Sequence, residues 1–165
     1  MAENFFVEAF IEIPKGDDRR RHLSYDKKEM LDLGPIKDAI PVNNGAMPIA
    51  YGFILGTLQY DESSKNPKEK PDEIDVLVYS EKNFKIGDVT KVTPIAILTR
   101  EDGDHKIMAV DDTVKKRLKE WGDISYEERD LILRYFGYKS PIRSIEGRNA
   151  AIDYIKGNRV RRTKK

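Results

Sequence analysis

The stretch Lys70-Pro-Asp-Glu-Ile-Asp-Val-Leu-Val-Tyr79 places two carboxylates, Asp72 and Asp75, three residues apart at the start of an apolar run. The run has the composition of a buried strand, and such a strand fixes the position of the loop that precedes it. Such a loop presents its carboxylate oxygens at a fixed separation, as hard divalent cations such as Mg²⁺ require. Acidic loops before strands are common, so the pattern by itself is a weak indication of a metal site.

Composition limits the classes of protein to which this chain can belong. Its 165 residues fit one domain with a substantial core. Charged residues make up 36% of the chain, but the net charge is only +1, which argues against nucleic-acid binding driven by bulk charge. The chain has no cysteine, which excludes disulfides, thiolate metal sites and a cysteine nucleophile. With no leader-like start and no apolar stretch of membrane-spanning length, a cytoplasmic protein without a membrane partner is expected.

Short strands separated by glycine and proline predict a small barrel of the α+β class, mainly β. The ranges with strand-like composition are 5–13, 51–60, 75–79, 89–98 and 106–110. Residues 16–22 should form a turn and a basic run, and residues 31–47 should form loops and short strands. The polar segment 62–71 is interpreted as an exposed insertion.

The last third of the chain changes to a helical period. Ser125-Tyr-Glu-Glu128 has the pattern of a capping box and predicts a helix that ends near Gly137. A second helix is expected over 149–155, closed by Gly157. One domain over 1–158 followed by a basic tail over 159–165 is the predicted organisation.

Four further segments accompany the acidic loop at characteristic intervals. They are Phe10-Ile-Glu-Ile-Pro14, Pro48-Ile-Ala-Tyr-Gly-Phe-Ile-Leu-Gly-Thr-Leu58, Ile97-Leu-Thr-Arg-Glu-Asp-Gly-Asp-His-Lys-Ile-Met-Ala-Val-Asp111 and Tyr135-Phe-Gly-Tyr-Lys139. In this order the chain resembles the soluble family I inorganic pyrophosphatases from about Phe6 to Gly157. The resemblance implies a distorted five-stranded OB-like barrel with two peripheral helices. It also implies a homo-oligomer, either a dimer or a hexamer, that hydrolyses pyrophosphate with Mg²⁺.

The resemblance also implies roles for individual residues. In this family Mg²⁺ ions activate the attacking water, an aspartate takes its proton, and cationic and tyrosine side chains hold the phosphates. The implied general base is Asp72. The implied metal ligands are Asp75, Asp104 and Glu12. The implied phosphate contacts are Tyr51, Lys106, Tyr138, Lys139 and, in place of an arginine that this chain lacks, Lys37 or an arginine of the 19–21 run.

Several positions depart from the family pattern. Lys70 stands where the first metal-ligating aspartate is expected, unless Asp61 fills that role from before the insertion. In the third metal loop Arg100, or Thr99, takes the place of the leading aspartate. A cation at a metal-ligand position repels Mg²⁺. The leading interpretation is a divergent Mg²⁺-dependent hydrolase of pyrophosphate or a close phosphoanhydride. The alternative is a catalytically inactive protein of the same fold that binds a partner or an anion.

Overall fold

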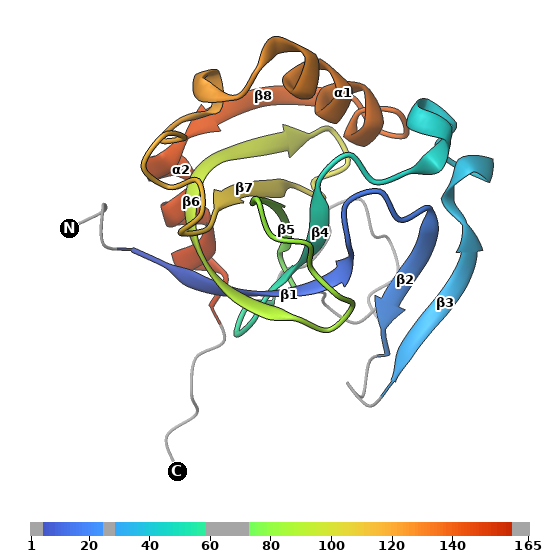
Figure 1. The fold of residues 1–165 in the computed structure, drawn as a ribbon. Coiled ribbons are helices and arrows are strands. Elements are labelled where there is room, and N and C mark those ends of the chain that lie inside the picture. Colours follow the sequence, from blue (N-terminus) through green and yellow to red (C-terminus); the bar gives the residue numbers. More distant parts are fainter. Residues whose placement is uncertain (1–4, 25–28, 59–72, 160–165) are drawn as a thin grey trace.

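The computed structural model describes residues 5–24, 29–58 and 73–159, which form mostly strands with two α-helices (Figure 1). The strands are β1 Val7–Ile13, β2 Arg19–Leu23, β3 Met30–Pro35, β4 Ala50–Ile54, β5 Asp75–Tyr79, β6 Val89–Arg100, β7 Lys106–Val110 and β8 Ile142–Gly147. The α-helices are α1 Tyr126–Phe136 and α2 Arg148–Gly157, and the 3₁₀ turns are η2 Ile36–Asp38, η3 Val42–Gly45 and η4 Trp121–Asp123. No helix of the described ranges is both long enough and apolar enough to cross a membrane.

A closed ring of five strands forms the centre of the fold. The strands follow one another in the order β1-β4-β5-β7-β6, and a further pairing of β1 with β6 closes the ring. All of these pairings are antiparallel except that of β5 with β7, which is parallel. The predicted α+β class with an OB-like barrel is therefore confirmed.

One long strand, β6, makes the closure possible. Its first part, from Val89 to Val92, pairs with β1, and the part from Thr93 onward pairs with β7. The register shifts between Pro94 and Ala96, as expected where a proline interrupts the ladder and a bulge bends the strand. The end of β6 also pairs with β8, which lies outside the ring.

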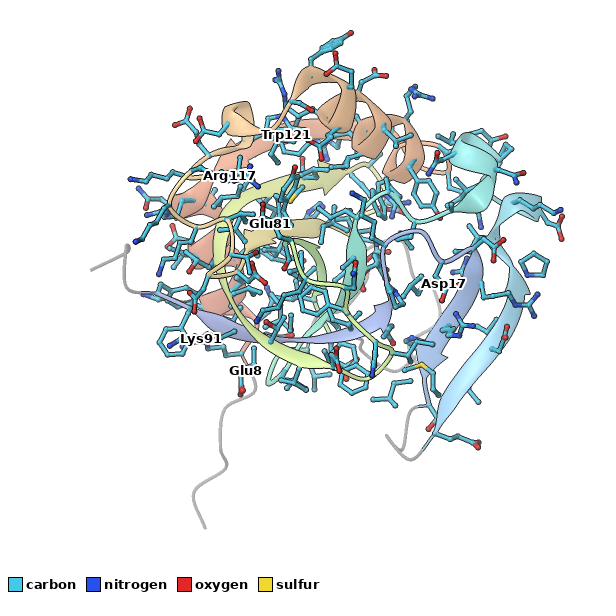
Figure 2. All side chains as sticks on the ribbon, in the orientation of Figure 1. Glu8, Asp17, Glu81, Lys91, Arg117 and Trp121 are labelled. Atoms are coloured by element: carbon cyan, nitrogen blue, oxygen red, sulfur yellow. The ribbon has the colours of Figure 1, made fainter. Side chains whose placement is uncertain are left out.

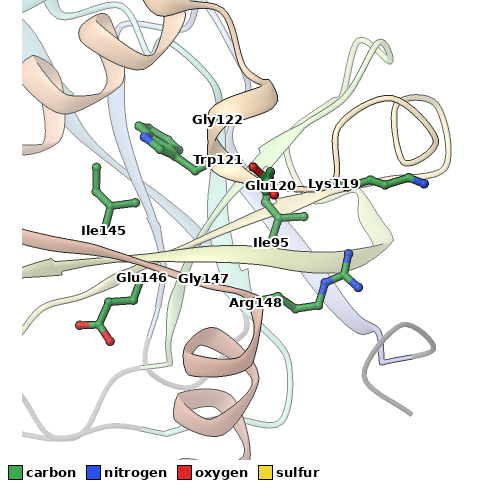
Figure 3. Close-up of a pocket in the computed structure, with 9 residues that line it drawn as sticks. All are labelled: Ile95, Lys119, Glu120, Trp121, Gly122, Ile145, Glu146, Gly147 and Arg148. Carbon is green, nitrogen blue, oxygen red and sulfur yellow. The ribbon is translucent and has the colours of Figure 1, made fainter.

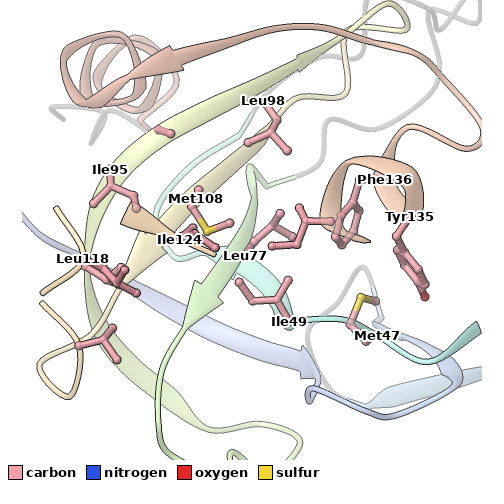
Figure 4. Packing of buried hydrophobic residues seen from close by; sticks show 14 of the residues in the cluster. Met47, Ile49, Leu77, Ile95, Leu98, Met108, Leu118, Ile124, Tyr135 and Phe136 are labelled. Atoms are coloured by element: carbon pink, nitrogen blue, oxygen red, sulfur yellow. The ribbon is translucent and has the colours of Figure 1, made fainter. Parts of the chain in front are cut away.

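The alternation of side chains along the strands divides the core into two buried clusters. On β5, Leu77 belongs to one cluster, whereas its neighbours Val76 and Val78 belong to the other. The first cluster also contains Tyr135 and Phe136 of α1, which face Leu77, Met108 and Met47 (Figure 4). The second cluster contains Ala151 and Ile155 of α2. Each helix therefore completes one of the two clusters.

Helix α1 begins as predicted, but only half of its capping box forms. The hydroxyl of Ser125 accepts a hydrogen bond from the backbone N–H of Glu128. The carboxylate of Glu128 does not return to the backbone of Ser125 within the described part of the chain. It accepts hydrogen bonds instead from the Tyr79 hydroxyl, at 2.7 Å, and from the Ser125 hydroxyl, at 2.8 Å. The side chain that was expected to cap α1 thus ties the helix to the end of β5.

Two strands were missed by the sequence analysis. The basic run, expected after a turn, is strand β2, which pairs with β3 in a separate two-stranded sheet beside the ring (Figure 1). An Arg19–Asp32 ion pair at 3.1 Å crosses this sheet. Strand β8 follows α1 and covers the end of β6. The strand expected over 51–60, with a break at Gly56, ends at Ile54, and the chain turns at Gly56 with φ of 79°.

Gly52 marks the closest approach of two ring strands. It lies opposite Ile11 in the β1–β4 ladder, and a Cβ atom placed on it would lie 1.8 Å from the backbone oxygen of Phe10. We expect Gly52→Ala to lower the free energy of unfolding by about 3 kcal/mol or more, since backbone must move to admit the methyl group. Chemical denaturation measures the change. Gly157→Ala is the matched control, because nothing lies within 4 Å of the added Cβ. Equal stabilities of the two variants would contradict the expectation.

Candidate functional site

The candidate site begins where β5 and β7 start side by side. Because these two strands are parallel, their first residues, Asp75 and Lys106, are partners in the ladder. The Lys106 ammonium donates to a carboxylate oxygen of Asp75 at 2.6 Å. It also donates to the hydroxyl of Tyr51, on neighbouring β4, at 3.4 Å. Three adjacent strands thus direct one side chain each to a single point.

Asp104, two residues before Lys106, completes this cluster. Its carboxylate accepts a hydrogen bond from the Lys106 ammonium at 3.1 Å, so the ammonium lies between two carboxylates. Lys106 is 3% exposed. A buried ammonium is tolerated only when it is paired and hydrogen-bonded, and this one has three acceptors for its three donor hydrogens. We name Tyr51, Asp75, Asp104 and Lys106 the lysine cluster.

Burial and charge shift the protonation of the lysine cluster in opposite directions. Burial raises the pKa of Asp75 to about 7, although the charge of Lys106 opposes the rise. For Asp104 burial is the largest single effect and raises the pKa, but the charge of Lys106, the hydrogen bonds of the carboxylate and the charge of Arg100 together lower it. For Lys106 burial is the largest single effect and lowers the pKa, but the surrounding negative charges, that of Asp75 foremost, together raise it. The lysine therefore stays charged at every physiological pH.

Helix α1 positions the tyrosine of the cluster. The ring of Tyr51 stacks on Phe136 of α1 with centroids 5.9 Å apart. The Lys106 ammonium lies 5.4 Å from the centroid of the Tyr51 ring. Burial, followed by the charge of Asp75, raises the pKa of Tyr51, so the phenol remains protonated. It can therefore donate a hydrogen bond to an anion.

Arg100, at the end of β6, lies beside the lysine cluster. Its guanidinium nitrogens lie 3.1 Å from a carboxylate oxygen of Asp102 and 3.5 Å from one of Asp104. The Arg100 side chain is only 10% exposed. Arg100 stands where an aspartate ligand was expected from the sequence, and Asp102 was not among the expected site residues. The Asp-Gly-Asp sequence of 102–104 was the available signal, because it places two carboxylates in one tight loop.

Glu12 of β1 is buried, at 2% exposed, and faces strand β2. One of its carboxylate oxygens accepts a hydrogen bond from the backbone N–H of Leu23 at 2.9 Å and lies 3.1 Å from Nδ1 of His22. It makes no direct contact with the lysine cluster among the described residues. Its charge nevertheless contributes to the raised pKa of Tyr51, so the two side chains are within electrostatic range.

The other expected site residues are not gathered at the lysine cluster. Tyr138 is 54% exposed and Lys139 is also exposed, both just after α1. Lys37, in η2, is exposed as well. The expected general base Asp72 and the alternative ligand Asp61 lie outside the described residues.

The oxygen donors of the lysine cluster fit a hard divalent cation in kind but are few in number. Asp75 and Asp104 are partly exposed carboxylates, the ligand type that Mg²⁺ prefers. Each also contributes one oxygen to Lys106. Over residues 5–24, 29–58 and 73–159, no group of three or more acidic, histidine or cysteine side chains is arranged to hold a metal. The described part of the chain thus offers Asp75 and Asp104 as candidate ligands and no complete metal site.

A separate pocket of about 540 Å³ lies on the outer side of β6 and β8 (Figure 3). It is lined by Ile95, Lys119, Glu120, Trp121, Gly122, Ile145, Glu146, Gly147 and Arg148. None of the site residues expected from the sequence is among them, so the pocket is distinct from the lysine cluster.

The raised pKa of Asp75 predicts a pH dependence of stability. Aspartate in an unfolded chain titrates near pH 3.9, whereas Asp75 in the folded protein has a pKa of about 7. Between these values the folded state binds more protons, so the free energy of unfolding contributed by this group falls as pH rises. Asp75→Asn removes the titration. The melting temperature of the variant minus that of the wild type should therefore increase from about pH 4.5 to about pH 7.5.

Thermal unfolding in metal-free buffer tests this expectation. Asp130→Asn, which removes an exposed carboxylate paired with Arg134 on α1, is the control and should show no comparable change. A difference between Asp75→Asn and wild type that is independent of pH would contradict the assignment of the raised pKa to Asp75.

Comparison with known proteins identifies the family. The family model described as inorganic pyrophosphatase matches residues 9–161. The inorganic pyrophosphatase of Helicobacter pylori is similar to this chain with 24% identity and a TM-score of 0.76, over 93% of this chain and 91% of its own. That of Thermus thermophilus has 23% identity and a TM-score of 0.75, over 93% and 88%. That of Ehrlichia chaffeensis has 21% identity and a TM-score of 0.76, over 93% and 92%.

Among the curated proteins, none matches this chain. The solved structures share its fold at low identity, and the family match covers nearly the whole chain. The chain that places Lys106 between Asp75 and Asp104 in a closed ring of strands therefore belongs to the inorganic pyrophosphatase family.

Proposed function

We propose that this protein hydrolyses inorganic pyrophosphate, or a closely related phosphoanhydride, with the help of Mg²⁺. Membership of the inorganic pyrophosphatase family supports the activity. The observation that carries the proposal is the lysine cluster, in which a buried ammonium and a protonated phenol lie next to two carboxylates. This combination pairs donors for a phosphate with ligands for a cation.

The reaction needs both kinds of group. A water oxygen attacks one phosphorus atom, the bond from that phosphorus to the bridging oxygen breaks, and the water proton passes to a base. Asp72 is the proposed base, from its place in the acidic loop next to Asp75. Divalent ions held by Asp75 and Asp104 would lower the pKa of the attacking water and offset the charge on the phosphates.

Lys106 and Tyr51 would act on the substrate directly. The ammonium stays charged, and its donor hydrogens now satisfy two carboxylates and a phenol. A phosphoryl oxygen is a strong acceptor that competes for these donors, and binding there offsets charge on the leaving phosphate. Tyr138, Lys139 and Lys37 remain proposed phosphate contacts from the family resemblance. Glu12 remains a proposed contributor to the metals, directly or through water.

The inactive alternative is supported by the cations at the site. Lys106 and Arg100 already pair with the carboxylates of Asp75, Asp102 and Asp104, which makes these oxygens less available to a metal. On this alternative the protein keeps the fold and binds an anion or a partner without hydrolysis. Assembly into dimers or hexamers and a cytoplasmic location also remain predictions.

Phosphate release from pyrophosphate distinguishes the two functions. The wild type should release phosphate with Mg²⁺, and Asp72→Asn should lower kcat by about 100-fold or more, the effect of removing a general base. Asp75→Asn should raise the Mg²⁺ concentration needed for half-maximal rate by about tenfold or more, because a metal ligand is lost. Arg134→Gln, which changes an exposed ion pair on α1, is the control. No release with Mg²⁺, Mn²⁺ or Zn²⁺ would favour the inactive alternative.

The acidic loop allows a second test, because two positions compete for one ligand role. If Lys70 occupies the position of a metal ligand, Lys70→Asp should raise turnover by about tenfold or more, equivalent to about 1.4 kcal/mol. If Asp61 fills that position, Lys70→Asp should change little and Asp61→Asn should abolish turnover. Steady-state kinetics over a range of Mg²⁺ concentrations separates these cases. If neither variant changes turnover or Mg²⁺ dependence, neither alignment describes a working metal ligand.

A further inference from the structure

Arg100 is a buried cation whose hydrogen bonding is incomplete. Its Nε atom is buried and has no acceptor among residues 5–24, 29–58 and 73–159. Its two terminal nitrogens make ion-pair contacts of 3.1 Å with Asp102 and 3.5 Å with Asp104. A buried N–H without a partner destabilises a fold and calls for an explanation beyond packing. We look for this explanation in the two carboxylates that Arg100 contacts, because they lie beside the lysine cluster.

The loop that carries these carboxylates is held firmly in place. The backbone N–H of Arg100 donates to Nδ1 of His105 at 3.0 Å, and that of Asp104 donates to the Asp102 carboxylate at 2.9 Å. The backbone N–H of Asp102 donates to the Ser140 hydroxyl at 3.1 Å. With both ends of the loop bonded, Asp102 and Asp104 are fixed next to the guanidinium. The Arg100 guanidinium itself lies beside one carboxylate oxygen of each, at 3.1 Å from Asp102 and 3.5 Å from Asp104.

The charges of the described residues around this position largely cancel. Asp75, Asp102 and Asp104 are three carboxylates, and Lys106 and Arg100 are two cations within ion-pair distance of them. With all five groups ionised, the net charge is a single negative one. A dication is attracted by uncompensated carboxylates, and a fixed neighbouring cation repels it.

We propose that Arg100 is a built-in cation that takes the place of one divalent ion in this centre. Its guanidinium pairs with Asp102 and Asp104 and offsets one of their two negative charges, so the protein binds one ion fewer than its carboxylates would otherwise hold. The inference rests on the proposed function only in treating Asp104 as a metal ligand, and it concerns binding rather than turnover. Arg100 is thus a residue that sets metal stoichiometry.

Counting bound Mn²⁺ tests the proposal without any measurement of activity. The full-length protein is stripped with a chelator, dialysed and titrated with Mn²⁺, with free ion measured by electron paramagnetic resonance. Arg100→Gln should bind one more Mn²⁺ per chain than the wild type. Arg100→Lys retains the charge and should keep the wild-type number. Arg117→Gln, which changes an exposed arginine paired with Glu81 at 3.1 Å (Figure 2), is the control and should also keep it.

Two further variants locate the extra ion and guard against a folding defect. Asp104→Asn combined with Arg100→Gln should lose the added ion. Asp102→Asn in the wild-type background keeps Arg100 and should leave the Mn²⁺ number unchanged, because Arg100 already neutralises that carboxylate. This variant tests the proposal even if Arg100→Gln does not fold, as judged by circular dichroism.

Three results would overturn the proposal. The first is an Arg100→Gln protein that folds but binds Mn²⁺ like the wild type. The second is an equal gain in Arg100→Lys, which would assign the effect to side-chain shape rather than charge. The third is the loss of an ion in Asp102→Asn. A wild-type protein that releases no phosphate from pyrophosphate would count against the proposed function and leave these results as they are.

Discussion

The buried ammonium of Lys106 is the interaction on which the rest of this site depends. A charge that is 3% exposed must be compensated where it stands, and it is compensated by Asp75 at 2.6 Å and Asp104 at 3.1 Å. This places a strict requirement on the register of β5 and β7, because a slip of one residue would move Asp75 to the opposite face of the sheet. The apolar residues that follow on both strands are buried and hold that register.

The closed ring explains how groups from distant parts of the sequence meet. β5 and β7 are parallel, and the chain between them runs through β6, which pairs with both β1 and β7. The bulge after Pro94 bends β6 so that one strand serves both neighbours. As a result the Arg100 end of β6, the loop 102–104 and the starts of β5 and β7 all lie at one rim. Helix α1 then holds Tyr51 against this rim through Phe136.

The electrostatics of the rim differ from those of a simple carboxylate site. Each carboxylate in the described part of the rim already has a cationic partner, either Lys106 or Arg100. Such pairing stabilises the folded protein at a position rich in acidic side chains, and it also makes metal binding a competition between Mg²⁺ and a side chain. The balance among metal binding, phosphate binding and these ion pairs depends on small differences between large electrostatic free energies. Removal of the charge of Arg100 or Lys106 is therefore expected to shift this balance.

The fold class, the family and the residues that gather at the candidate site were predictable from the sequence. Short apolar runs at 75–79 and 106–110 predicted β5 and β7 at their observed bounds, and Ser125 predicted the start of α1. The motifs named Asp75, Asp104, Lys106 and Tyr51, which the structure brings together. Strong local patterns of this kind depend on neighbours along the chain, so they can be read without a structure.

Contacts between distant segments could be decided only by the tertiary structure. Strand β2 was missed because it is stabilised by pairing with β3 and by the ion pair of Arg19 with Asp32, neither of which is a local signal. Glu128 was expected to cap its own helix, but Tyr79, 49 residues away, donates to it. Asp102 is held beside Arg100 by Ser140, 38 residues away, whose hydroxyl accepts a hydrogen bond from the Asp102 backbone N–H. In each case a long-range partner of opposite charge or hydrogen-bonding type outweighed the local preference, and that partner can be identified only once the chain is folded.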